Sequence, residues 1–366
     1  MINIYTRSPF IVEIDESGQV STKIELYIVT GNGTLPTSPS YTLSKLIPSS
    51  NVTATYYDVS NYIREFINHN TIVSAYDTDV MNTNTFAQVR ITRYKNLGAG
   101  DVAIDTTDYL AFDGYTPYES GSNYENNKSM CTPITYYYNY DSNINLGVDF
   151  NDVPTTIGIP FYDADEYAVV YTNLSTGATS STIITSTVSG GGTYLFPRQV
   201  KSVIDAYYAV GNKVEIKNNL TSQTYATYYF IPYEECKYTA NKIDFVNKWG
   251  QYQRIWFFGA SYDYVDSTSK EYMNKQSSLS NYSTIEGQMK EFNINGVKRI
   301  KVNSGWVDEE FKDVIEEILM SEKILVNGYP AKLTTKNVEK YKNINTKQIN
   351  YELDFTFNYQ LINSVS

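Results

Sequence analysis

The sequence predicts a mainly β fold with a few short helices, an α+β protein built from several antiparallel β-sandwich-like modules. Three observations lead to this fold class. The 366 residues exceed the usual length of one domain, so two or three domains are expected. Tyrosine is in large excess at 36 residues, and it favours strands as threonine does. Several segments alternate apolar and polar residues with period 2, which is typical of half-buried antiparallel strands.

The first predicted domain spans residues 1–125 and is β-rich with one short helix. A strand is expected over residues 21–31, with three apolar side chains on one face: Ile24, Leu26 and Ile28. The helix is expected within residues 58–69, where apolar residues follow the i, i+3, i+4, i+7 spacing: Val59, Tyr62, Ile63, Phe66 and Ile67. Either Asp58 or Ser60 can cap its start. Further strands are expected over residues 86–95 and 108–121.

The middle of the chain divides into a linker and a second domain. Residues 126–155 are rich in Asn, Ser, Asp and Tyr and are expected to form a linker or long loop. Residues 156–235 have the size of a small β-sandwich-like domain. One helix is expected there over residues 197–211, with Pro197 in its first turn and Gly211 closing it.

The last predicted domain, residues 236–366, is an α+β domain with one amphipathic helix on an antiparallel sheet. Hairpin turns are expected at Lys248–Gln251 and at Asn327-Gly328. Between them, residues 262–287 are polar and nearly patternless. This segment is expected to form a long exposed loop that projects outward and contacts a neighbouring subunit or another protein of the same assembly.

The helix of the last domain is expected to run from Val307 to Met320. Its apolar residues line one face, and Asn303 or Ser304 can cap it: Val307, Phe311, Val314, Ile315, Ile318 and Leu319.

The chain closes with an alternating strand from Gln348 to Leu361, which has one apolar face. The helix and the strand each need a partner, and the simplest arrangement lays the helix across the sheet. Phe355 is then expected near Phe311 or Ile315.

Aromatic residues are concentrated in the segment from residue 236 to 261. Phe245, Ile255 and Phe257 share one face of the expected hairpin, whereas the second strand also carries apolar side chains on its other face. Two apolar faces indicate burial between layers or against another chain. The residues suspected of inter-subunit contact are Trp249, Tyr252, Trp256 and Phe258.

The net charge and the targeting signals of the chain limit the partners that are expected. The formal net charge is −11, and no dense run of Lys and Arg is present. Specific nucleic-acid binding is therefore not expected, although an acidic chain suits the wall of a passage for DNA. No signal peptide and no membrane span are expected. The two cysteines, Cys131 and Cys236, are expected to be free thiols.

The search for catalytic or metal-binding residues favours a non-enzymatic protein without a cofactor. His69 is the only histidine, and we expect it on the surface near a helix end. Residues Asp141 to Asp152 resemble a calcium loop, but Leu146 stands where glycine is needed and Asp152 where a glutamate is needed. A solvated loop is the better interpretation, and no metal site is expected. Asp163, Asp165 and Glu166 fit a turn as well as they fit paired catalytic carboxylates.

Three stretches resemble a family of tailed-bacteriophage virion proteins. They are residues 236–261, residues 302–326 and residues 333–359, and the opening third carries similar patterns at residues 56–67 and 108–125. This family occurs in the crAss-like phages of Bacteroidales. The resemblance covers about two thirds of the chain and is weak over residues 125–235. It implies a multi-domain β-rich subunit that forms rings in the tail or neck of a short-tailed phage, and it carries over no catalytic residue.

The leading hypothesis is a structural virion protein that forms a homo-oligomeric ring in the tail or collar and bridges to other tail, portal or collar proteins. It is expected to be made in the host bacterial cytoplasm and to reside in the virion. The alternative is a head-fibre or receptor-binding virion protein whose Tyr-rich loops recognise a host surface glycan. A carbohydrate-active enzyme with an acidic cluster near Asp163 is the least favoured hypothesis.

Overall fold

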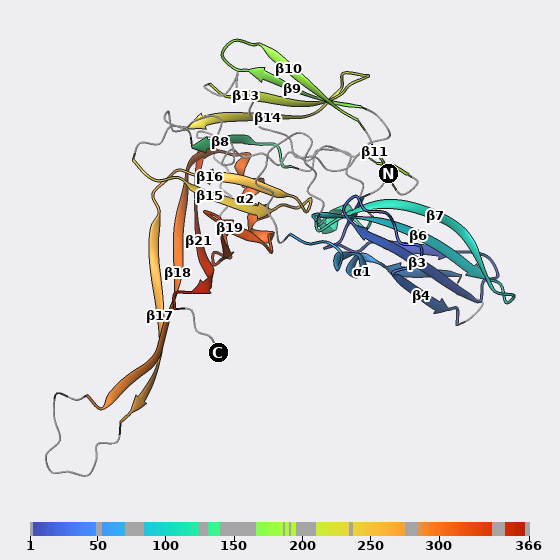
Figure 1. The fold of residues 1–366 in the computed structure, drawn as a ribbon, viewed down its shortest axis with the longest axis horizontal. Coiled ribbons are helices and arrows are strands. Elements are labelled where there is room, and N and C mark those ends of the chain that lie inside the picture. Colours follow the sequence, from blue (N-terminus) through green and yellow to red (C-terminus); the bar gives the residue numbers. More distant parts are fainter. Residues whose placement is uncertain are drawn as a thin grey trace. The chain divides into compact units, whose positions relative to one another are not determined.

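The computed structural model describes residues 3–48, 53–69, 84–123, 131–139, 166–185, 187–189, 192–194, 210–233, 237–274, 285, 287–338 and 348–362. The chain forms two compact units. The first comprises Met1–Glu234, Phe245–Ile255 and Asp313–Ser321, and the second comprises Glu235–Asp244, Trp256–Lys312 and Glu322–Ser366. Strands in antiparallel and mixed sheets dominate both units, which confirms the predicted mainly β fold class (Figure 1).

The N-terminal part of the first unit contains a five-stranded sheet with the order β1-β7-β6-β3-β4 and a two-stranded sheet of β2 and β5. All neighbouring strands are antiparallel except β1, which runs parallel to β7. The bounds are β1 (Asn3–Tyr5), β2 (Ile11–Asp15), β3 (Ser21–Thr30), β4 (Tyr41–Leu46), β5 (Ala54–Asp58), β6 (Phe86–Asn96) and β7 (Asp101–Phe112). A 3₁₀ turn, η1 (Tyr118–Ser120), follows.

The core of this part lies between the β3–β6–β7 face, the small β2–β5 sheet and helix α1 (Ser60–Arg64). The predicted strand alternation is confirmed, because Ile24, Leu26 and Ile28 are buried and the residues between them are not. A short helix is present as predicted, with Val59 and Ile63 buried, but it ends at Arg64, so Phe66 and Ile67 lie beyond it. Asp58 stabilises its start, since the Asp58 Oδ1 accepts from the Ser60 amide at 3.1 Å.

A second five-stranded sheet of the first unit has the order β10-β9-β13-β14-β8. Only the β14–β8 pair is parallel. The strands are β8 (Thr135–Asn139), β9 (Tyr167–Asn173), β10 (Thr179–Ile184), β13 (Asn212–Asn218) and β14 (Thr224–Tyr233), and β11 (Thr187–Ser189) pairs with β12 (Gly192–Tyr194). The helix predicted over 197–211 and the calcium-like stretch Asp141–Asp152 lie outside the described residues, apart from Val210 and Gly211, which are not helical.

A seven-stranded sheet has the order β16-β15-β19-β20-β21-β18-β17. The strands are β15 (Asn241–Val246), β16 (Tyr252–Phe257), β17 (Tyr262–Met273), β18 (Met289–Asp308), β19 (Ile324–Val326), β20 (Tyr329–Leu333) and β21 (Gln348–Gln360). The two predicted hairpins are confirmed. At the second one, Asn327 and Gly328 have φ of 52° and 85°, the left-handed pair that a two-residue turn of this kind requires.

Helix α2 (Phe311–Met320) starts later than predicted. The prediction that it begins at Val307 is wrong, because residues Trp306 to Asp308 pair with Gln348 to Asn350 as part of β18. Asn303 and Ser304 also belong to that strand and cap nothing. The apolar spacing before Phe311 therefore reflected strand alternation, in which Val307 is buried and Trp306 exposed.

The predicted long loop over residues 262–287 is wrong for its first half. Residues 262–273 form β17, which pairs with β18 from the Tyr262–Lys301 pair to the Met273–Met289 pair. The sequence does not predict this strand, because both of its faces are solvent-exposed and it therefore has no apolar alternation. Figure 1 shows the two strands continuing together as a two-stranded ribbon. We call this pair of strands, residues 262–273 with residues 289–301, the ribbon.

Within the described residues, no helix has the length and apolar character needed to cross a membrane.

Candidate functional site

The aromatic segment predicted to make inter-subunit contacts lies largely inside its own chain. Tyr252 and Phe258 are buried, and Trp249 and Trp256 are half-buried. The Trp249 ring packs 5.7 Å from the ring of Tyr5 within the first unit. The aromatic surface of Tyr252 and Phe258 is therefore used within the subunit. An inter-subunit role for the four residues stays a prediction, with Trp249 and Trp256 retaining exposed surface for it.

The turn between β15 and β16 is fixed by Asn247. Its Oδ1 accepts from the backbone amides of Trp249 and Gln251, both at 3.0 Å. The backbone amide of Asn247 donates to the Gln251 carbonyl. An Asn side chain that bonds to amides two and four residues ahead favours a tight turn over a continued strand. The sequence Asn-Lys-Trp-Gly-Gln is therefore well suited to this turn.

Two glycines let the turn approach the segment after β7 at backbone distance. A Cβ on Gly114 would lie 2.4 Å from the Lys248 carbonyl oxygen, and one on Gly250 would lie 2.7 Å from the Asp113 amide nitrogen. The Tyr115 amide donates to the same Lys248 carbonyl at 2.8 Å. Residues about 135 positions apart in the sequence are thus joined by main-chain contact, which side chains larger than hydrogen would prevent.

His69 contradicts its predicted surface position. It is only 7% exposed, and its Nε2 lies 3.6 Å from Oδ2 of Asp113. Arg64 occupies the other Asp113 oxygen at 2.8 Å, and the Tyr252 hydroxyl donates to the His69 carbonyl. Because Arg64 and His69 both face one carboxylate, Asp113, which follows β7, holds the end of α1 and the segment after it in place, which is a structural role.

A second buried network surrounds Glu317 on α2. Its Oε1 accepts from the Thr132 hydroxyl and lies 3.3 Å from Lys248 Nζ. Burial raises the pKa of Glu317 above its usual value, although Lys248 opposes the shift. The sequence pattern does not predict burial of this residue, because a glutamate at the flank of an amphipathic stripe normally faces solvent.

Hydrogen bonds of Gln253 connect this network to β8, because the Gln253 Oε1 accepts from the Thr132 backbone amide at 3.4 Å. Gln253 Nε2 donates to the Tyr136 hydroxyl at 2.8 Å, and the Gln253 Oε1 accepts from Asn247 at 3.1 Å. The Cys131 sulfur lies 2.7 Å from the same Tyr136 oxygen. Burial raises the pKa of Cys131 to about 12, so this thiol stays protonated and does not act as a nucleophile near neutral pH.

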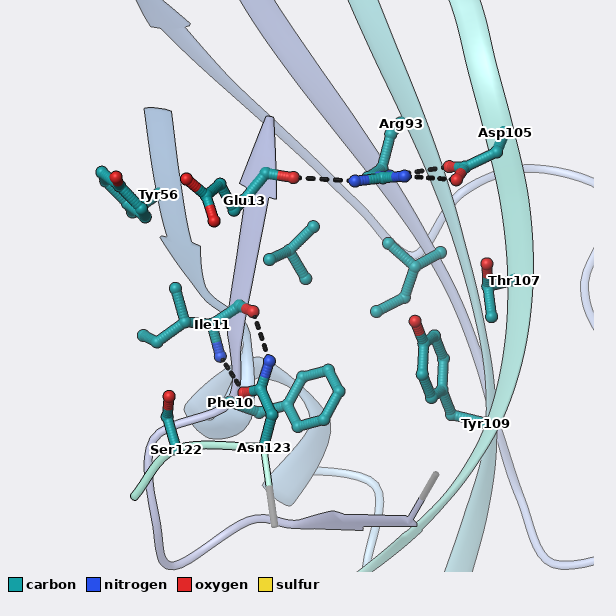
Figure 2. A pocket seen from close by; sticks show the side chains of 12 residues that line it. Phe10, Ile11, Glu13, Tyr56, Arg93, Asp105, Thr107, Tyr109, Ser122 and Asn123 are labelled. Atoms are coloured by element: carbon teal, nitrogen blue, oxygen red, sulfur yellow. Dashed lines mark hydrogen bonds and ion pairs between the residues drawn. The ribbon is translucent and has the colours of Figure 1, made fainter. Parts of the chain in front are cut away.

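An open cleft of about 430 Å³ lies on the N-terminal part of the first unit (Figure 2). Apolar and aromatic side chains line part of it, including Phe10 and Tyr109, whose rings meet edge to face at 5.4 Å. Tyr56 and Glu13 line it as well, and Asn123 both accepts from and donates to the Ile11 backbone at 2.8 Å.

Two charged groups of the cleft, Arg93 and Asp105, already neutralise each other. Arg93 binds Asp105 in a two-point ion pair and donates to the Glu13 carbonyl at 2.8 Å (Figure 2). The hydrogen bond from Arg93 lowers the pKa of Asp105, which therefore stays ionised and cannot serve as a general acid at neutral pH. The arrangement suits binding of a neutral polar molecule better than acid–base chemistry.

The candidate acidic cluster and metal sites receive no support from the described part of the chain. Among these residues, no group of three or more His, Cys, Asp and Glu side chains is arranged to hold a metal ion. Asp163 and Asp165 lie outside the described residues, whereas Glu166 accepts from the Asn219 amide group at 2.9 Å.

Comparison with known proteins adds no relative: no family model, no curated protein and no solved structure matches this chain.

Proposed function

We propose that this chain is a non-enzymatic structural subunit of a tailed-phage virion, which assembles into a ring in the tail or collar and bridges to other virion proteins around the DNA path. The observation that carries the proposal is the exposed β-ribbon of the second unit. All twelve residues of β17 are exposed, as are the first six of β18. A monomeric protein seldom maintains a ribbon of this length with apolar side chains in water.

The apolar residues of the ribbon make it suitable for protein–protein contact. Eight large side chains are between 43% and 71% exposed: Tyr262, Tyr264, Val265, Tyr272, Met273, Met289, Phe292 and Ile294. Aromatic and methionine side chains are enriched in interface cores, where they are covered by a partner. The net charge of −11 further supports a wall around DNA rather than a DNA-binding surface.

The ring is tested by mass photometry and negative-stain electron microscopy of the purified protein, alone and within particles that contain it. The expected result is a closed cyclic oligomer on the tail axis. A protein that is monomeric in isolation and forms peripheral projections on particles would contradict the ring.

A deletion tests the role of the ribbon in assembly. Residues 269–294 are replaced by Asn-Gly, which joins the paired residues Thr268 and Asn295 through a two-residue turn. We expect the shortened chain to fold, because the deleted residues that the structure describes are exposed, and to lose incorporation into particles. Normal incorporation would show that the ribbon is dispensable.

The cleft in Figure 2 favours a second candidate, a receptor-binding virion protein that recognises a host surface glycan. Tyr56 and Tyr109 offer aromatic faces, and Thr107, Ser122 and Asn123 offer polar groups. A glycan array with the wild-type chain and with Tyr109→Ala tests this candidate. Binding that the substitution abolishes would favour it over the ring.

A further inference from the structure

Strand β17 ends the seven-stranded sheet and has β18 as its single neighbour among the described strands. An edge strand presents unpaired N–H and C=O groups to another chain along its outer side. Native edges are often interrupted by a bulge. Here the bulge lies in β18, where Asn293 has φ of 51° and three β18 steps oppose two steps of β17, from Thr268 to Lys270. The outer edge of β17 therefore stays regular over all twelve residues.

The side chains on one face of β17 have a symmetric arrangement about Thr268. Since successive side chains of a strand alternate between faces, residues at even positions share one face. From the centre outward these are Asp266 and Lys270, then Tyr264 and Tyr272. Charged residues that prevent an edge strand from pairing usually repel a second copy. Asp266 and Lys270 instead have opposite signs and lie at equal distances from Thr268.

We propose that two copies of this chain pair through β17, antiparallel and edge to edge, about a two-fold axis at Thr268. In this register each Asp266 lies opposite Lys270 of the second copy, and each Tyr264 lies opposite Tyr272. Directly opposed charges of opposite sign and directly opposed aromatic rings both stabilise antiparallel pairs.

The neighbouring contacts within the chain support this register. Asp266 forms an ion pair with Arg299 at 3.1 Å, yet its side chain is 55% exposed, so it retains room for a second cation. Tyr272 already packs edge to face against Phe292 at 5.5 Å. A second copy would therefore extend an existing aromatic pair by the ring of its Tyr264.

A two-fold contact closes on itself, so it joins two subunits or two rings and does not build a ring by itself. The pairing stands apart from the virion function proposed above. Loss of the ring would leave it intact, and a failed charge exchange or cross-link would refute the pairing while leaving the ring proposal unchanged.

Charge exchange across the axis tests the register by sedimentation velocity over a concentration series. Asp266→Lys places lysine opposite Lys270, and Lys270→Asp places aspartate opposite Asp266, each twice per dimer. We expect each single substitution to raise the dimer dissociation constant about tenfold or more. The double variant Asp266→Lys/Lys270→Asp again opposes unlike charges and is expected to recover dimerisation.

Asp263→Lys is the matched control. It makes the same charge change on the same strand but on the opposite face, where the register places Met273 against it, so its effect is expected to be much smaller. A wild-type chain that stays monomeric throughout the concentration series would overturn the proposal. A double variant as weak as the two single variants would do the same.

Cysteine cross-linking gives an independent readout that does not depend on affinity. In a chain with Cys236→Ser and the buried Cys131 retained, Thr268→Cys opposes itself across the axis and is expected to form a covalent dimer on mild oxidation. Tyr262→Cys, six residues away on the same strand, is separated from its counterpart by most of the strand length and is expected to remain monomeric. Equal cross-linking of both variants would indicate random collision and refute the register.

Discussion

The Nζ of Lys248 lies 3.3 Å from Oε1 of Glu317, and the Glu317 side chain is 2% exposed. A lysine in the β15–β16 turn thus neutralises a carboxylate on α2, and the Thr132 hydroxyl donates to the same oxygen. Removal of one member of a buried ion pair leaves the other charge uncompensated, which costs more than the pair itself contributes. This contact therefore makes the packing of three distant segments sensitive to pH and to single substitutions.

Lys248→Met is expected to lower the free energy of unfolding by about 2–4 kcal/mol at pH 7.5, because Glu317 then lies buried without its cation. The loss should shrink at pH 5, where Glu317 can take a proton. Urea unfolding at both pH values measures it. Lys312→Met, which removes only the surface pair with Glu309, is the matched control and should cost less than about 0.5 kcal/mol. A similar loss from both substitutions would contradict the buried role of Lys248.

The pH dependence of Glu317 has a definite sign. Burial raises its pKa in the folded state above the unfolded value, so the folded state holds this proton more tightly. The resulting stability is fully present below the unfolded pKa of about 4.3 and is lost as the pH rises through the folded pKa. Glu317→Gln should therefore flatten the unfolding free energy over this window. An unchanged pH profile in the variant would show that Glu317 does not titrate as described.

Gly250→Ala is expected to destabilise the first unit strongly. Gly250 has φ of 76°, and an added Cβ would lie 2.7 Å from the Asp113 amide nitrogen. Gly18 is a matched control, because its φ is 77° and nothing lies within 4 Å of an added Cβ. Both alanines carry the same conformational strain, so the difference isolates the clash, about 1–3 kcal/mol in urea unfolding. Equal losses would mean that the turn does not dock against Asp113.

Phe355→Ala is expected to cost about 3–5 kcal/mol through lost burial and the cavity left behind. Phe355 is fully buried in β21. The next residue, Thr356, faces the other side of the strand, where its hydroxyl lies 2.7 Å from that of Thr334, so Thr356→Ala should cost less than about 1 kcal/mol. Urea unfolding of both variants measures this contrast, and a neutral Phe355→Ala would show that β21 does not anchor its sheet. A contact of Phe355 with Phe311 or Ile315 stays a prediction.

Iodide quenching separates the three tryptophans. Trp306 is 70% exposed, whereas Trp249 and Trp256 are half-buried. Trp306→Phe should therefore remove most of the readily quenched fluorescence of the isolated chain. In the assembled state, Trp249 and Trp256 are expected to become shielded further. Free quenching of both indoles in the assembly would exclude them from the inter-subunit contact.

Local sequence patterns determined the elements whose signals are confined to neighbouring residues. One buried face explains the alternation of Ile24, Leu26 and Ile28 and the apolar spacing around α1. A local backbone preference explains the Asn327-Gly328 turn. For the same reason the mainly β class follows from composition and period. These preferences act over a few residues, so the sequence alone carries them.

Only the tertiary structure decided the features that depend on distant partners. Residues 306–308 match both a helix and a strand, and their pairing with β21 selects the strand. β17 carries no apolar alternation, and its strand exists because β18 supplies the hydrogen bonds. His69 and Glu317 belong to residue types that usually face water, yet Asp113 and Lys248 accompany them into the interior. Burial and charge pairing arise between segments that meet only after folding, and a linear pattern contains no record of which segments those are.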